Sequence, residues 1–255
     1  MSTWYHNDTE ELLYGLGDSL SLMRTLDAES IDLILTDPPW NTGRTQETHD
    51  NQYEDSFVDF RAFLVPRIQE MHRLLSPSGT LILHMGPKEA HNVKIWLDEV
   101  FGEKNFYGEI ITYSELGRGS GSCVWTTRHS YIYIYSKRVG KNFVNASELP
   151  PVERKAPKKG AEKYDGDTKK AFSVLPWTMS NSDPQRLGYP SQKHVGLYQA
   201  LLKVHCLPGG LVLDPFAGSG TTGEAALSHA CSVILLDKNP QSLQVNTKRF
   251  GLRPS

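Results

Sequence analysis

The chain has 255 residues, 38% of them hydrophobic and 22% charged, and its formal net charge is −2. This length and apolar content predict a single α/β core with an insertion, and the near-neutral charge argues against a uniformly basic protein that binds a polyanion. The sequence contains no run of eighteen apolar residues, and residues 1–8 lack the basic start and apolar core of a secretion signal. We therefore expect a cytoplasmic protein without a membrane partner.

The three cysteines, Cys123, Cys206 and Cys231, lie far apart and are odd in number. Their spacing matches neither a zinc site nor a disulfide framework. We expect reduced thiols and no bound metal, so the chemistry of the chain rests on other residue types.

The first strong signal is a predicted strand over residues 31–36 that ends directly at Asp37, Pro38, Pro39 and Trp40. In open α/β sheets, ligands bind at this carboxyl end of the strands. The two prolines lack N–H donors and fix φ near about −65°, so the carbonyl groups of Asp37 and Pro38 point outward. A carboxylate, a carbonyl and a flat ring suit an amine on a planar base. Taken alone, the four residues fit a simple proline turn equally well.

Helices and strands are predicted to alternate after this motif. We predict a polar loop over residues 41–56, a helix over 57–75, a strand over 80–85 and a helix over 89–101. Residues 109–113 and 130–135 are predicted to form an antiparallel hairpin at the edge of the sheet. The glycine-rich connection 116–122 contains Arg118 and fits either a loop that closes over a ligand or a plain hairpin turn.

The charge is unevenly distributed along the chain. Residues 137–170 contain ten Lys or Arg against five Asp or Glu, so this segment carries +5 and the rest of the chain −7. The segment is rich in Pro and Lys and lacks apolar periodicity, as expected for an insertion that contacts a nucleic-acid backbone. A solvated surface loop is the alternative. We divide the chain into residues 1–136, an insertion at 137–187 and residues 188–255.

The carboxyl-terminal part repeats the pattern of a strand that ends at an acid. The apolar strand 211–214 ends at Asp214, and Gly218 and Gly220 then permit a tight turn into a helix predicted from residue 220 to about 229. Another strand, 232–237, ends at Asp237, where doubly wound folds place a carboxylate against ribose hydroxyls. This is a nucleotide-type cradle, although it lacks the Lys of the phosphate loop.

Five motifs in this order resemble those of the S-adenosylmethionine-dependent amino-methyltransferases of DNA, which methylate the exocyclic amine of adenine or cytosine. The motifs span nearly the whole chain and comprise residues 17–18, 36–40, 188–193, 214–222 and Asp237. The catalytic motif precedes the cofactor motif, as in the permuted β subgroup, whose target-recognition segment lies between them. The resemblance implies a Rossmann-like α/β methyltransferase fold, with a mixed seven-stranded sheet and helices on both faces.

The resemblance also implies roles for individual residues. The Asp37 carboxylate and the Pro38 carbonyl would hold the target amine, and Trp40 would stack on a base flipped out of double-stranded DNA, with Pro39 completing the catalytic motif. Around S-adenosylmethionine, the resemblance places Asp18 at the adenine amine, Phe216 at the adenine face, Asp237 at the ribose, Gly218, Gly220 and Thr221 around the methionine part, Ser191 and Lys193 at its carboxylate, and Asp214 within the same motif. The expected DNA contacts are Arg118, Lys155, Lys158 and Lys159.

The motifs depart from the usual family pattern at two positions: Trp40 stands where Tyr is more common, and His194 replaces a proline. Asp37 favours adenine as the target, because cytosine-specific members more often have Ser there. Cytosine N4 and an RNA adenine remain alternatives, as do a small-molecule or protein-amide methyltransferase and a catalytically silent DNA-binding relative. A homodimer and a cognate restriction endonuclease are the further partners considered.

Overall fold

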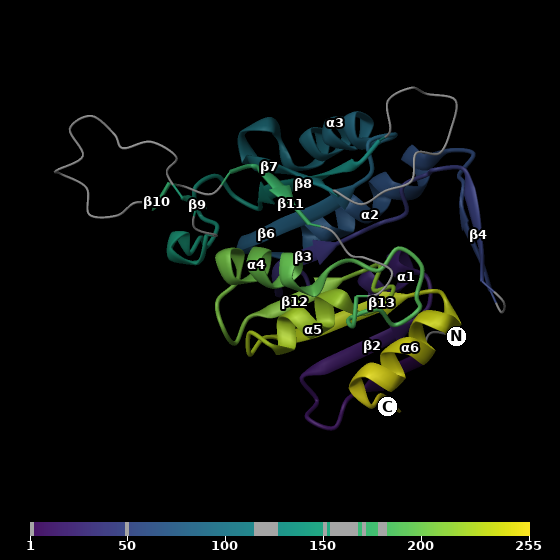
Figure 1. The fold of residues 1–255 in the computed structure, drawn as a ribbon. Helices are drawn as coiled ribbons and strands as arrows, with labels where there is room; N and C mark the ends of the chain where they lie inside the picture. The colour runs from purple at the N-terminus through teal and green to yellow at the C-terminus, as the bar shows by residue number, and fades with distance from the viewer. Residues whose placement is uncertain are drawn as a thin grey trace, which may run out of the picture.

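In the part of the chain that the structure describes, a mixed sheet of ten strands runs through the centre of the protein (Figure 1). The computed structural model describes residues 3–48, 51–114, 127–149, 152–153, 168–169, 172–177 and 183–255. The strands lie in the order β11 (Val174–Pro176), β7 (Phe106–Tyr113), β8 (His129–Ser136), β6 (Leu75–Met85), β3 (Ile31–Thr36), β12 (Leu211–Asp214), β13 (Ser232–Asp237), β2 (Leu12–Leu16), β1 (Thr3–His6) and β14 (Arg253–Pro254).

The five central strands, from β6 to β2, are parallel, and β8 and β7 continue the sheet in antiparallel fashion. β3 pairs with β6 on one side and with β12 on the other. Parallel strands covered on both faces need nearly continuous apolar sequences, which residues 31–36 and 232–237 provide. The pairing of β3 with β12 brings the two predicted motif strands side by side although they lie far apart in the sequence.

The structure confirms the predicted α/β class, the mixed sheet and the antiparallel pairing of residues 109–113 with residues 130–135. The sheet has ten strands instead of seven because β1 and β14 extend one edge and β11 extends the other. β11 pairs in parallel with β7, so the prediction that the β7–β8 hairpin forms the edge was wrong. β11 has only three residues, which are too few to show a periodicity that could be recognised from the sequence.

The prediction of a loop over residues 41–56 was also wrong, because this segment contains a hairpin of β4 (Arg44–Thr48) and β5 (Asn51–Asp55). Its sequence is polar at nearly every position, so it shows no alternation of apolar and polar residues that would indicate a strand. At the base of the hairpin, the Asp55 carboxylate accepts the amides of Asn41 (2.7 Å) and Thr42 (3.0 Å). These bonds fix the chain directly after Trp40.

Helices cover both faces of the sheet, as predicted (Figure 1). One face packs against α1 (Ser19–Met23), α2 (Phe60–Leu74) and α3 (Ala90–Phe101), and the other against α4 (Val195–His205), α5 (Thr221–Leu227) and α6 (Pro240–Phe250). The α2 helix begins later than predicted because Asp59 caps it, accepting the Ala62 amide at 2.8 Å. Within the described residues, no helix is long and apolar enough to cross a membrane.

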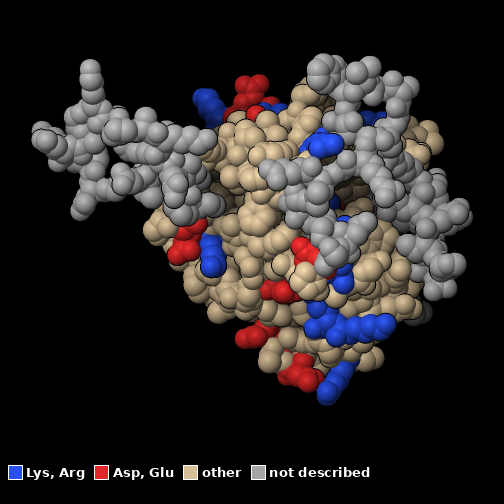
Figure 2. Space-filling model, viewed as in Figure 1, with Lys and Arg blue, Asp and Glu red and all other residues tan. Residues whose placement is uncertain are grey.

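Part of the predicted insertion belongs to the folded body. Lys137 donates to the His72 carbonyl, and the Asn145 amide donates to the Val204 carbonyl at 2.8 Å in α4. The remaining short elements are η1 (Glu103–Asn105), η2 (Ala146–Glu148), β9 (Val152–Glu153) and β10 (Thr168–Lys169). The four predicted DNA contacts lie outside the described residues, and the division into three segments stays a prediction. On the face shown in Figure 2, basic and acidic side chains of the described residues lie close to each other.

Candidate active site

Asp214 at the end of β12 connects the ends of the two central strands. Its carboxylate accepts hydrogen bonds from Thr36 Oγ1 at the end of β3 (2.7 Å), from Thr222 Oγ1 in α5 (2.6 Å) and from the Phe216 amide (3.0 Å). Asp214 is only 3% exposed, and burial raises its pKa to about 6 despite these donors. The side chain fixes where β3 and β12 end, and it also forms part of a pocket wall.

The turn that follows Asp214 requires glycine at two positions, because Gly218 and Gly220 have positive φ angles of 50° and 77°. The Gly218 amide donates to Asp237 Oδ2 (2.8 Å), and the Gly220 amide donates to the Ala217 carbonyl (2.8 Å). Both N–H groups are therefore used within the protein. The two glycines provide the predicted tight turn, and Gly218 provides a backbone surface that lines the pocket.

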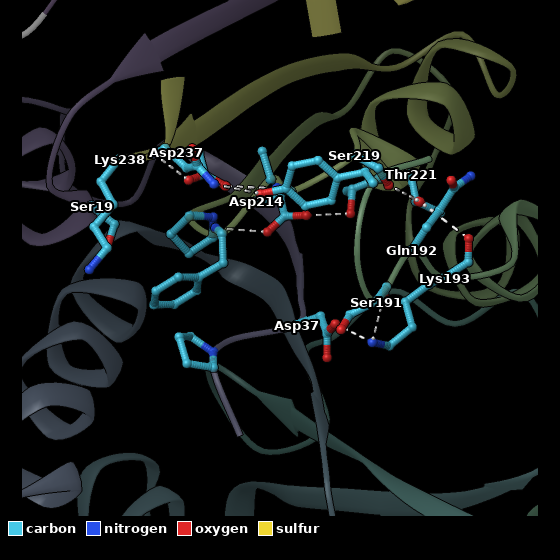
Figure 3. A pocket seen from close by; sticks show the side chains of 18 of the residues that line it. Ser19, Asp37, Ser191, Gln192, Lys193, Asp214, Ser219, Thr221, Asp237 and Lys238 are labelled. Carbon is cyan, nitrogen blue, oxygen red and sulfur yellow. Dashed lines mark hydrogen bonds and ion pairs between the residues drawn. The ribbon is translucent and has the colours of Figure 1, made fainter. Parts of the chain in front are cut away.

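Asp237 at the end of β13 also lines this pocket, which is the first of two adjoining pockets (Figure 3). Its two carboxylate oxygens accept the amides of Gly218 and Asn239, each at 2.8 Å. Burial raises the pKa of Asp237, although these amides oppose the shift. Each carboxylate oxygen can accept about two hydrogen bonds, so the oriented carboxylate retains capacity for the hydroxyl donors of a ligand.

A second oriented carboxylate, Asp18, lines the same pocket. It caps α1 by accepting the Ser21 amide at 3.0 Å, and it forms an ion pair with Arg67. Burial opposes ionisation, but the Ser21 amide and Arg67 outweigh it and hold the pKa of Asp18 below its usual value. The rings of Phe216 and Phe63, whose centroids are 6.1 Å apart, line the same pocket. The pocket thus combines acceptors with flat apolar surfaces.

Asp37, directly after β3, lies where the first pocket meets a second one. Asp37 Oδ1 accepts the Trp40 Nε1 proton at 2.8 Å, and Oδ2 forms an ion pair with the Lys193 ammonium. The side chains of Asp37 and Lys193 are only 19% and 17% exposed. Burial raises the pKa of Asp37, while Lys193 and Trp40 lower it. Figure 3 shows the Asp37 and Lys193 side chains pointing toward each other.

Trp40 has a fixed position in the second pocket. One side of its ring lies against the backbone of Gly86, where an added Cβ would come within 2.6 Å of Trp40 Cδ2. The Lys193 ammonium lies 4.6 Å from the centroid of the Trp40 ring, and the His84 ring is 5.7 Å away. The indole therefore presents an oriented flat surface next to the Asp37 carboxylate.

Sequence reasoning missed a row of polar side chains in the second pocket, formed by His84 of β6, Ser130 of β8 and Thr112 of β7. His84 Nε2 and Ser130 Oγ are 2.7 Å apart, and Ser130 Oγ and Thr112 Oγ1 are also 2.7 Å apart. Burial and the nearby Lys193 hold the pKa of His84 well below its usual value, so the imidazole is neutral. The signal available in the sequence is a single histidine within the otherwise apolar run 81–85.

The structure brings most of the predicted site residues together around these two adjoining pockets. Asp37, Ser191 and Lys193 line both pockets, whereas Pro39 lines only the first and Pro38 and Trp40 only the second. The first pocket is also lined by Asp18, Asp214, Phe216, Gly218, Thr221 and Asp237, while Gly220 lies in the turn behind it. Sequence reasoning missed the contributions of Phe63 and Arg67, and it assigned no role to Tyr189 within the motif 188–193.

Comparisons with known proteins identify the family. Residues 31–248 match the model of the N6/N4 methyltransferase family, described as DNA methylase. This chain belongs to that family. The methyltransferase is 25% identical over 268 residues to the DNA adenine methyltransferase YhdJ of Escherichia coli, covering 98% of this chain and 85% of YhdJ.

Two solved structures show the same fold. The PvuII cytosine-N4-specific DNA methyltransferase superposes with a TM-score of 0.72 at 18% identity, covering 94% of this chain and 86% of that one. The protein TTHA0409 of Thermus thermophilus, complexed with S-adenosyl-L-methionine, gives a TM-score of 0.61 at 21% identity, with 94% of each chain covered. The Rossmann-like methyltransferase fold implied by the resemblance is confirmed.

S-adenosylmethionine is the cofactor of this family, and the first pocket fits it. The cofactor carries hydroxyl and amine donors, a flat adenine and a methionine carboxylate. The pocket offers the carboxylates of Asp18 and Asp237, the flat ring of Phe216 and the cation of Lys193. The groups that line the pocket are therefore chemically complementary to those of the cofactor.

Asp237→Ala is expected to weaken S-adenosylmethionine binding by about 1.5–3 kcal/mol, the usual contribution of a charged hydrogen bond. The matched control is Asp8→Ala, which removes an exposed carboxylate that does not line the pocket and should leave the affinity unchanged. Isothermal titration calorimetry measures both. Equal affinities of Asp237→Ala and the parent protein would exclude Asp237 from cofactor binding.

Proposed function

We propose that this methyltransferase transfers a methyl group from S-adenosylmethionine to the 6-amino group of an adenine flipped out of double-stranded DNA. The observation that carries the proposal is the position of Asp37, whose carboxylate lies at the junction of two pockets beside the oriented Trp40 ring. The first pocket would hold the cofactor and the second the target base. In this arrangement the amine nitrogen of the target base and the methyl group of the cofactor would lie on the two sides of the Asp37 carboxylate.

The chemistry of an exocyclic amine explains the need for these residues. Its lone pair is delocalised into the ring, so the nitrogen becomes nucleophilic only when acceptors hold its N–H bonds. The Asp37 carboxylate and the Pro38 carbonyl would serve as these acceptors, and Asp37 would receive the proton that the nitrogen loses. The raised pKa of Asp37 suits that role.

The bound cofactor supplies a methyl group on a sulfonium, whose S–C bond breaks as the N–C bond forms. The protein contributes mainly orientation and electrostatic stabilisation. In the proposal, Phe216 stacks on the cofactor's adenine, Asp237 accepts from its ribose and Asp18 from its amine. Gly218, Gly220 and Thr221 surround the methionine part, and Ser191 and Lys193 bind its carboxylate.

Two features support adenine over cytosine. The carboxylate of Asp37 is the acceptor that the family more often pairs with adenine, and the wide indole of Trp40 stacks best on a purine. A base within a duplex cannot reach this buried junction, so the proposal includes base flipping, with stacking on Trp40 offsetting part of the cost. The named relatives include one adenine enzyme and one cytosine-N4 enzyme, so the base is decided by experiment.

The experiment is expression in a host that lacks DNA methylation, followed by nucleoside digestion and mass spectrometry of its DNA and RNA. We expect N6-methyladenine in DNA, and none with the Asp37→Ala variant expressed at the same level. If 4-methylcytosine is the only product, the target is cytosine, and methylation confined to RNA would overturn the DNA proposal. Sequencing with modified-base detection then identifies the recognition site.

DNA contacts complete the proposal, with Arg118 of the connection 116–122 and with Lys155, Lys158 and Lys159 of the basic segment on the phosphate backbone. The contacts of the three lysines rest on the net charge of +5 over residues 137–170. The salt dependence of DNA affinity reports them directly. A second copy of the chain and a restriction endonuclease with the same recognition site are the proposed protein partners.

A further inference from the structure

The Lys193 ammonium has three partners at the junction of the two pockets. It forms an ion pair with Asp37 Oδ2, donates to the Ser191 carbonyl at 3.2 Å and lies 4.6 Å from the centroid of the Trp40 ring. The other carboxylate oxygen, Asp37 Oδ1, accepts from Trp40 Nε1. Each oxygen of Asp37 thus already has a donor from the protein.

These contacts coincide with those that the proposed function requires of the target amine. An amine positioned for methylation must donate to Asp37, and its ring must stack on the exposed side of Trp40, since the other side lies against Gly86. Lys193 supplies an N–H donor to the same carboxylate and a cation next to the same indole. The ammonium and the target amine cannot occupy this position together.

The Lys193 side chain can also turn toward the first pocket, because Lys193 lines the first pocket as well as the second. Its backbone is held near the cofactor turn, where the Lys193 carbonyl accepts from Thr221 Oγ1 at 3.3 Å. A flexible four-carbon side chain on a fixed backbone can direct its charge to either side. An anion in the first pocket, such as the carboxylate of an amino acid, would form an ion pair with the ammonium in place of the ion pair with Asp37.

We propose that the Lys193 ammonium, in the absence of cofactor, occupies the position beside Asp37 that the target amine takes in the productive complex. The carboxylate of the bound cofactor attracts the ammonium into the first pocket and so frees this position for the base. Lys193 is then a positioning residue that makes productive DNA binding depend on prior cofactor binding. This inference rests on the proposed function for the identity of the two ligands. It goes beyond that function by assigning an order of binding and the residue that enforces it.

The test measures DNA affinity by fluorescence anisotropy, using a labelled duplex that contains the recognition site. With the parent protein, S-adenosylhomocysteine should tighten DNA binding by about tenfold or more, because its carboxylate removes the competing ammonium. An analogue of S-adenosylhomocysteine without the carboxylate should bind the pocket without this effect. Equal enhancement by both compounds would overturn the proposal.

Lys193→Met provides the decisive variant. It removes a positive charge, which by general electrostatics should weaken DNA binding, yet we expect it to tighten binding in the absence of cofactor by about tenfold and to abolish the enhancement. Lys203→Met, which removes the same charge from an exposed position on α4, is the matched control and should bind no more tightly than the parent. Lys193→Arg, which keeps the charge, should retain the enhancement.

A duplex with an abasic target position separates competition for the amine site from other effects of the substitution. With no amine to compete, Lys193→Met should show no gain in affinity over Lys203→Met. A gain of the same size on the abasic duplex, or an unchanged enhancement by S-adenosylhomocysteine, would contradict the exchange. If the parent protein methylates DNA while either result is found, this inference fails and the proposed function stands. If the parent methylates no DNA, the proposed function itself fails.

Discussion

Asp37→Ala is expected to slow methyl transfer by about 10³-fold or more, while the affinity for S-adenosylmethionine changes by no more than a few fold. The reason is that the carboxylate lies at the junction of the pockets and would act on the amine of the base, not on the cofactor. Single-turnover transfer of a labelled methyl group to DNA measures the rate, and calorimetry measures cofactor affinity.

Asp37→Asn is the matched control for this change. An asparagine retains one oxygen acceptor but loses the negative charge and cannot take up a proton at neutral pH, so we expect a rate between those of the parent and Asp37→Ala. A parent-like rate in Asp37→Ala would remove Asp37 from the mechanism. A large loss of cofactor affinity in the same variant would instead place Asp37 among the cofactor ligands.

Gly220→Ala is expected to destabilise the protein by about 3–5 kcal/mol. At φ 77° any L side chain is strained, and the added Cβ would overlap Asn246 Oδ1 and come within 2.8 Å of Phe250. Asn246 is fully buried and donates to the carbonyls of Gly218 (3.0 Å) and Ser242 (2.8 Å), so moving it breaks the connection between the turn and α6. Urea denaturation measures the free energy of unfolding.

Gly209→Ala separates backbone strain from steric overlap. Gly209 has a similar φ of 84°, but no atom lies within 4 Å of the added Cβ. We expect a loss of only about 1–2 kcal/mol, which is the cost of the left-handed conformation alone. If both variants lose the same stability, the packing of Asn246 against the turn contributes nothing measurable.

The sequence allowed the main strands and the two motifs to be predicted because each signal is local. An apolar run that stops at an acid reports a buried parallel strand and its carboxyl end, as residues 31–37 and 211–214 illustrate. The hairpin at 44–55 gives no such signal, since its residues are nearly all polar and show no alternation of apolar and polar positions. The edge strand β11 is too short to show such an alternation.

Within the site, the residues that sequence reasoning missed depend on contacts between distant parts of the chain. His84, Ser130 and Thr112 come from three strands and meet only through the sheet register. The partner of Lys193 could not be predicted either, because the motif fixes its backbone near the cofactor turn while its long side chain reaches Asp37, 156 positions away. Local pattern identifies which residues gather at a site, but only the folded chain determines which of them touch.

The strand order also constrains how the protein can be made. β12 and β13 lie between β3 and β2, so these two earlier strands are not neighbours, and each lacks one of its two partners until residues 211–237 have been synthesised. Until then one edge of each strand has backbone N–H and C=O groups without their partners in the sheet, and long-range pairing of this kind is intrinsically slow. A chain that stops before residue 211 lacks β12 and β13, and with them Asp214 and Asp237, so we expect it to be unable to methylate.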